Sequence, residues 1–286
     1  MRGEAGLRAM QARDWRRRWH NRAATSILSI MAVMAIAPLF FIFVYLFIRG
    51  AAGLSWAFFT ELPRPVGESG GGVANAITGS AVLLALASAG GIPLGLAAGM
   101  KLSERERGPT SQMLRAVIDL MTSVPSIIVG LFAYAFLVVP LSGYSAWAGG
   151  AALMIIMLPI VARATEEILN LVPDHVREAG LALGLPRWKV TLMIILPGVK
   201  AGLATGVLLA GARVAGETAP LLFTAFSNQF GFRGLDQPIA SLPVQIFTLA
   251  SNPDEISRQM AWTAALSLVF LVFIVNVITR LLLRRK

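Results

Sequence analysis

Six apolar segments, each long enough to cross a membrane as a helix, constrain this chain more than any other feature of its sequence. A helix needs about 20 apolar residues to cross the hydrocarbon. The segments of that length are residues 25–48, 73–100, 113–138, 145–169, 198–226 and 260–283. With 56% hydrophobic and 14% charged residues, the chain is far too apolar for a soluble domain. The sequence therefore predicts an all-α integral membrane protein with six transmembrane helices.

Basic residues predict the orientation, because Lys and Arg concentrate in the short cytoplasmic segments of membrane proteins. They gather before the first segment, at the end of the last one and in two loops, 101–112 and 170–197. They are Arg13, Arg16, Arg17, Arg18, Arg22, Lys101, Arg105, Arg107, Arg177, Arg187, Lys189, Arg280, Arg284, Arg285 and Lys286. We expect both termini to be cytoplasmic. Residues 1–24 then form a basic cytoplasmic N-terminal arm, residues 25–286 form the transmembrane domain, and the loops 49–72 and 227–259 are polar outer loops.

Composition also limits the chemistry. The chain has no cysteine, which excludes disulfides and thiolate metal sites, and only His20 and His175 could supply imidazole. The formal net charge of +10 is explained by the orientation signals, so we do not expect nucleic-acid binding. The first apolar run, Ile27 to Ile48, is longer than the core of a signal peptide and is interpreted as a retained anchor. An alternative role for the basic arm is to lie on anionic lipid.

The cytoplasmic loop LVPDHVREAGLALGLPRWKVTLMIILPGVK predicts two short helices joined at a glycine. Asp174 is expected to cap the first helix, with Val176, Ala179 and Leu183 on one face, and Gly184 to end it. Pro186 is well placed to start the second helix. Such an element lies on the membrane or enters a groove of a soluble partner.

Two charges interrupt the fifth apolar segment, for which we expect one helix over 198–226. Gly202, Gly206, Ala210, Arg213 and Glu217 follow one another at helical spacing and share a face. Small residues let membrane helices approach closely, and charges at the bilayer centre cost about 2.5–3.5 kcal/mol each on the insertion scale. The two charges are therefore expected to face a partner or a pathway. They line an anion route, or they form an i,i+4 ion pair that fixes helix register.

Arg163, at the cytoplasmic end of the fourth segment, is a second candidate for anion binding, since a guanidinium donates paired hydrogen bonds to an oxyanion and stays protonated. Its alternative role is that of an orientation charge.

The spacing within the cytoplasmic loop resembles a known motif. Glu178-Ala179-Gly180, three residues, Gly184, nine residues and then Ile194-Ile195-Leu196-Pro197 are similar to the EAA loop of type I ABC-importer permeases, E-A-A-x3-G-x9-I-x-L-P. Gly180 replaces the second alanine. The resemblance implies the type I ABC-importer permease fold, and it implies that Glu178, Ala179, Gly180 and Gly184 couple the chain to an ATPase subunit.

Further blocks resemble the permease subunits of phosphate importers. They are GGGVANAITGS, SVPSIIVGLFAY, LPIVARATEEILNLVP, ARVAGETAPLLFTAFSNQF and QPIASLPVQIF. The resemblance implies a second, homologous permease, two copies of an ATPase that holds ATP and Mg, an extracytoplasmic phosphate-binding protein, and a bacterial cytoplasmic (inner) membrane. It implies transport roles for Arg163, Arg213 and Glu217, and no cofactor on this chain. The run GETAPLLFTAFSNQF favours one of the two unlike permease types. The other type, or a sulfate or molybdate permease, remains an alternative.

Other classes fit the sequence less well. GESGG, residues 67–71, has the spacing found around the serine of intramembrane proteases, yet neither histidine lies in a span where it could act as a base for Ser69. The sequence has no G-x-x-x-x-G-K-[ST] motif, so ATP hydrolysis must belong to a partner. A secondary transporter or channel would account for the intramembrane charges but not for the EAA-like loop.

Overall fold

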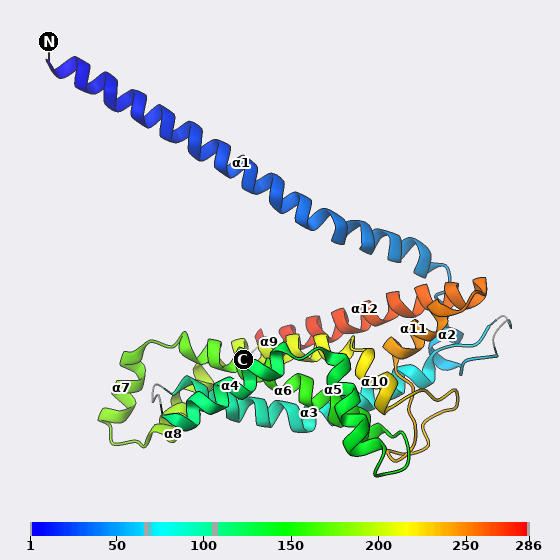
Figure 1. Cartoon of the computed structure of the whole chain (residues 1–286). Coiled ribbons are helices and arrows are strands. Elements are labelled where there is room, and N and C mark those ends of the chain that lie inside the picture. The colour runs from blue at the N-terminus through cyan, green and yellow to red at the C-terminus, as the bar shows by residue number, and fades with distance from the viewer. Residues whose placement is uncertain (1, 66–67, 69, 105–107, 285–286) are drawn as a thin grey trace. The chain divides into compact units, whose positions relative to one another are not determined.

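The computed structural model describes residues 2–65, 68, 70–104 and 108–284, and the side chains of residues 17–65, 68, 70–104 and 108–281. The chain divides into two compact units, residues 1–49 and 50–286, which we describe separately (Figure 1). Several residues considered above lie outside the described residues or side chains. They are Arg13, Arg16, Ser69, Arg105, Arg107, Arg284, Arg285 and Lys286.

The first unit is almost entirely one helix, α1, Arg2–Ala51. The predicted basic arm and the first apolar segment belong to this single helix, which also contains Pro38. The arm therefore has no structural boundary at residue 24, and only the change from basic to apolar side chains separates it from the segment that follows.

The second unit is built from helices alone within the described residues. They are α2 Trp56–Thr60, α3 Ala74–Ser103, α4 Pro109–Ser123, α5 Ser126–Ala133, α6 Ala146–Asn170, α7 Asp174–Ala182, α8 Arg187–Lys189, α9 Leu196–Ala215, α10 Ala219–Thr224, α11 Leu242–Ser251 and α12 Glu255–Arg284. Two π-helical segments, η1 Tyr134–Val138 and η2 Val190–Ile195, follow α5 and precede α9. Over the described residues, five helical stretches are long and apolar enough to cross a membrane, and α4 with α5–η1 makes a bent sixth.

The third predicted span is sharply bent. α4 and the α5–η1 helix meet at an angle of 102°, where 113–138 was expected to form one helix. Val124 adopts an extended backbone conformation between the two helices, and Pro125, with a φ of −57° and a ψ of 137°, is not helical either. Proline disfavours the helical conformation of the residue before it and cannot donate a backbone hydrogen bond. Pro125 therefore splits this span into two arms.

α3 and α6 pack closely at the centre of the second unit because glycines line α3. A Cβ built on Gly91 would lie 3.0 Å from Met157 Cβ, one on Gly95 would lie 2.7 Å from Val161 Cβ, and one on Gly99 would lie 2.5 Å from the carbonyl oxygen of Ala162. Such contacts leave no room for a side chain. The four-residue glycine spacing thus brings the two helices together, as small residues do in membrane bundles.

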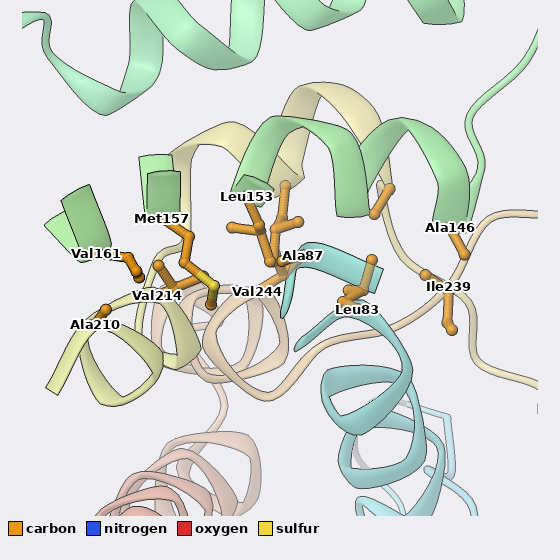
Figure 2. Close-up of a cluster of buried hydrophobic side chains, with 12 residues drawn as sticks. Leu83, Ala87, Ala146, Leu153, Met157, Val161, Ala210, Val214, Ile239 and Val244 are labelled. Carbon is orange, nitrogen blue, oxygen red and sulfur yellow. The ribbon is translucent and has the colours of Figure 1, made fainter. Parts of the chain in front are cut away.

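A single apolar cluster joins α3, α6 and α9. Figure 2 shows Leu153 and Met157 of α6 with Leu83 of α3 and with Ala210 and Val214 of α9, and all five are buried. α6 is the central helix because it contacts α3 on one side and α9 on another. The candidate charges on α6 and α9 are therefore held on helices that pack directly together.

Replacing Gly95 by alanine should destabilise the α3–α6 packing, because the new methyl group would meet both Val161 Cβ and the carbonyl oxygen of Leu158. Overpacking of this kind costs about 1–3 kcal/mol. We expect a lower unfolding temperature for the purified permease complex. Gly211→Ala is the matched control, because nothing lies within 4 Å of a Cβ built on Gly211. Equal unfolding temperatures for the two variants would contradict the close packing described here.

The two ends of the second unit differ. Figure 1 shows α7 and α8 at one end and α2 and α11 at the other. α11 lies inside the region 227–259, for which we expected a polar loop, and its Leu242 and Val244 are buried. The backbone N–H of Leu242 donates to Oγ of Ser80 on α3 at 2.8 Å. The expectation is therefore wrong for residues 242–251, which form an apolar helix packed on the bundle.

α12 begins after a capping carboxylate. Asp254 Oδ2 accepts a hydrogen bond from the backbone N–H of Ser257 at 2.8 Å. That bond, together with a bond from the Ser257 hydroxyl, lowers the pKa of Asp254 below its usual value. The charged form is therefore favoured in the folded protein, and the cap is lost only when the pH falls through this lowered pKa. At neutral pH the cap is intact.

Candidate functional site

The segment that contains Arg213 and Glu217 is not one helix. α9 ends at Ala215 and α10 begins at Ala219, so Glu217 lies in the connection between them. The expectation of one helix over 198–226 is therefore wrong. Gly216 is a poor helix former, and Pro220, in the first turn of α10, has no N–H with which to continue the α9 hydrogen-bond ladder. These two residues explain why the helix stops between the charges.

The seam of small residues on α9 is confirmed, but Arg213 does not continue it. A Cβ built on Gly202 would lie 3.2 Å from Ile168, and one on Gly206 would lie 2.9 Å from Ala164 Cβ, so this face packs on α6. Arg213 is exposed and Glu217 is partly buried.

Arg213 and Glu217 are not paired with each other: within the described part of the chain, neither side chain makes an ion pair. The expected i,i+4 pair is absent because Glu217 lies beyond the helix end. Arg213 thus presents an unpaired guanidinium at the surface of a chain whose helices are apolar.

Arg163 belongs to a network of four charges between α4 and α6. Its Nη1 lies 2.8 Å from Glu166 Oε2, and its Nη2 contacts Asp119 Oδ1. The other oxygen of Glu166, Oε1, lies 2.6 Å from Arg115 Nη1. The alternating order Arg115, Glu166, Arg163, Asp119 gives the network no net charge. Arg163 is therefore more than an orientation charge, because it links the two helices.

The network includes three residues that the sequence reading missed. Arg115 and Asp119 are four residues apart on α4, and Glu166 is three residues after Arg163 on α6. Both spacings place the charges on one helix face, and all four lie within segments predicted to cross the membrane. The sequence signal for these residues was the presence of charges at helical spacing in two apolar segments. That spacing does not predict that α4 pairs with α6.

Removing Glu166 should destabilise the fold more than removing its neighbour. The Glu166 side chain is 6% exposed and bridges two arginines, so alanine would leave both guanidinium groups without their carboxylate. We expect Glu166→Ala to cost about 1–3 kcal/mol, less than for a fully buried pair because both arginines reach solvent. The readout is thermal unfolding of the purified complex. Glu167→Ala, at an exposed position, is the control, and an equal shift in both variants would contradict the bridging role.

The predicted helix–glycine–helix element is present as α7 and α8. The expectation that Asp174 occupies the N-cap is wrong, because Pro173 lies at the N-cap of α7 and Asp174 is the first helical residue. At the other end Gly184 has a φ of +78°, a conformation that favours glycine. The N–H groups of Gly184 and Leu185 donate to the carbonyl oxygens of Leu181 and Gly180. This Schellman motif ends α7 as predicted.

α7 is fastened to the bundle at two points. Arg177 Nη2 donates to the carbonyl oxygen of Leu169 at the end of α6, at 2.9 Å. Gly180 is buried against η2, and a Cβ built there would lie 2.9–3.1 Å from side-chain atoms of Val190 and Ile194. The small residue of the EAA-like motif is thus required by a direct contact between α7 and the helix that continues into α9.

The outward surface of α7 is partly apolar. Leu183 is 80% exposed, and Glu178 and Ala179 are exposed as well. Ala179 and Leu183 of the predicted apolar face are therefore not packed on this chain, which leaves them available to a partner, whereas Val176 is partly buried. A cavity of about 320 Å³ lies between α7 and η2, with charged lining residues that include Glu178 and Arg177. Among the described side chains, no three His, Cys, Asp or Glu residues are grouped closely enough to hold a metal ion.

Comparisons with known proteins agree with this geometry. The family described as "Binding-protein-dependent transport system inner membrane component" matches residues 91–286. A protein named "Phosphate transport system permease protein PstA" from Yersinia pestis is 41% identical over 100% of this chain and 98% of its own length. A protein of the same name from Xylella fastidiosa (strain Temecula1 / ATCC 700964) is 44% identical, with 95% of each chain covered.

One solved structure with a similar fold is an inward-facing form of the MetNI methionine ABC transporter. The match has a TM-score of 0.60 and 20% sequence identity, and it covers 74% of this chain and 96% of the MetNI chain. At that identity the likeness concerns the fold, which is that of a type I ABC-importer permease.

Proposed function

The chain belongs to the family of binding-protein-dependent transport system inner membrane components, and on that premise we propose how it works. It is a multi-pass membrane protein and a permease subunit of a phosphate ABC importer. The observation that carries this function is the similarity, along nearly the whole chain, to proteins named as phosphate transport permeases. The exposed α7 element adds a physical reason, because a permease driven by ATP needs a surface through which an ATPase can act.

We propose the following partners, which the family resemblance implies. This chain, of the PstA type, pairs with one copy of the homologous permease PstC. Two copies of the ATPase PstB bind the cytoplasmic face, and the phosphate-binding protein PstS docks on the outer face, at the non-helical parts of 49–72 and 227–259. The complex lies in the bacterial cytoplasmic (inner) membrane.

Arg213, Glu217 and Arg163 are proposed to line the phosphate pathway. Arg213 supports this role best, because it is exposed at the end of α9. A guanidinium suits a phosphate oxyanion, to which it donates two parallel hydrogen bonds. A charged side chain within an apolar bundle faces a partner or a water-filled path rather than lipid. Phosphate would meet Arg213 in the cavity between the two permeases and Arg163 nearer the cytoplasm.

Coupling is proposed to run through α7. Exposed Glu178 and Ala179 contact the ATPase, and Gly180 transmits the movement of α7 to η2. Gly184 forms the turn between α7 and α8. Since η2 continues into α9, a displacement of α7 reaches the helix that carries Arg213. ATP and Mg bind the partner ATPase, and this chain has no catalytic role and no cofactor of its own.

Phosphate uptake by cells that lack this chain tests the proposal. Uptake should return when the chain is restored, and it should vanish again when the ATPase subunit is deleted. A secondary transporter or channel would keep working without the ATPase. ATPase-independent uptake through this chain would therefore overturn the importer assignment.

A further inference from the structure

The four-charge network between α4 and α6 offers Arg163 two carboxylates of very different accessibility. Glu166, on one side of the guanidinium, has a side chain that is 6% exposed. Asp119, on the other side, has a side chain that is 56% exposed. Arg163 itself is 28% exposed. One partner is thus enclosed by the fold, and the other is open to solvent.

This difference makes the two contacts unequal. Glu166 is held from both sides, by Arg163 and by Arg115, and its removal from this position would break two ion pairs and leave a buried carboxylate without its partners. Asp119 contacts one arginine, Arg163, and an ion pair exposed to water is weak because solvent competes for both charges. Arg163 therefore keeps Glu166 through Nη1, while its bond to Asp119 through Nη2 can be exchanged.

A phosphate ion and a carboxylate compete for the same guanidinium donors, since both offer oxygens that match the planar fork of arginine. We propose that Asp119 occupies the solvent-exposed donor group of Arg163, Nη2, when no phosphate is present, and that phosphate displaces it during transport. Asp119 is then a positioning residue, an internal stand-in for the substrate. The proposal rests on the proposed pathway role of Arg163.

The position of Asp119 gives the exchange a mechanical consequence. Asp119 lies on α4, five residues before the non-helical break at Val124 and Pro125. The Asp119–Arg163 and Arg115–Glu166 pairs link α4 to α6. Displacement of Asp119 by phosphate removes one of these two links, so α4 is released in part only when substrate reaches Arg163. The carboxylate also clears phosphate from Arg163 afterwards, because it returns to the same donor.

The test is a titration of the purified, nucleotide-free importer complex with inorganic phosphate, followed by ³¹P NMR. Asp119→Asn removes the competing charge, so we expect phosphate to bind at least about fivefold more tightly and uptake turnover to fall because release slows. Asp119→Glu keeps a competing carboxylate and should bind within about twofold of wild type. Glu167→Gln removes an exposed carboxylate from the same region of α6 and is the control for general loss of negative charge.

The outcomes separate this inference from the function on which it rests. Unchanged or weaker phosphate binding in Asp119→Asn, with binding lost in Arg163→Gln, would overturn the stand-in role and leave the pathway role intact. Normal binding and uptake in Arg163→Gln would overturn both. Tighter binding in Glu167→Gln equal to that in Asp119→Asn would also overturn the proposal, since charge alone would explain it. Should the asparagine variant fail to assemble, Asp119→Ser provides the same neutral substitution.

Discussion

Replacing Arg213 by glutamine is expected to abolish phosphate uptake while the importer complex still assembles. Arg213 is exposed at the end of α9, and within the described residues it forms no ion pair that the substitution could break. The fold therefore loses little. The pathway loses a donor of charge-assisted hydrogen bonds, each worth about 1.5–3 kcal/mol, so uptake should fall by about a hundredfold or more.

The matched measurements for this variant are uptake of radiolabelled phosphate and co-purification of the partner subunits. Arg258→Gln is the control, because Arg258 is also exposed and its ion pair with Glu255 is long at 3.8 Å. We expect Arg258→Gln to transport normally. If Arg213→Gln retains normal uptake, Arg213 does not belong to the pathway.

Replacing Gly180 by valine should uncouple the permease from its ATPase. Even a Cβ at this position would lie 2.9–3.1 Å from side-chain atoms of Val190 and Ile194, and valine adds two further methyl groups. Overpacking costs roughly 1–3 kcal/mol, which α7 can relieve by moving away from η2. We expect phosphate uptake to be lost and ATP hydrolysis to become independent of the loaded binding protein, with Gly180→Ala giving an intermediate defect.

The control for added volume is Gly143→Val. Nothing lies within 4 Å of a Cβ built on Gly143, and its φ is not in the left-handed range. This variant should retain uptake and stimulated ATP hydrolysis. Coupled transport by Gly180→Val at the wild-type rate would show that the contact between α7 and η2 does not carry the movement.

The architecture was largely predictable because it depends on local patterns. Apolar segments of membrane length predicted the long helices, and a glycine after the first cytoplasmic helix predicted the turn at Gly184, whose positive φ favours a residue without a Cβ. Gly202 and Gly206 predicted a close helix contact, and both pack on α6. In each case the pattern that made the prediction lies within one short segment of the chain.

The structure differs from the sequence-based predictions where long-range packing or a local helix break outweighs the hydrophobic pattern. The apolar segments continue through Pro125 and Gly216, so hydropathy alone predicted unbroken helices there. In the structure a helix ends next to each of these residues. The apolar helix α11 has only 10 residues and lies in a segment whose flanks are polar, so it was not predicted. The link between Asp119 and Arg163 depends on which helices pack together, and that information is absent from the spacing of either helix alone.

The most direct test of the account is phosphate uptake by proteoliposomes that contain this chain with its partner permease, the ATPase and the binding protein. We predict that labelled phosphate accumulates only when ATP is supplied on the ATPase side, that an excess of sulfate leaves the rate unchanged, and that the complex with Arg213→Gln is inactive. Accumulation without ATP, or equal competition by sulfate, would contradict the assignment of this chain to a phosphate ABC importer.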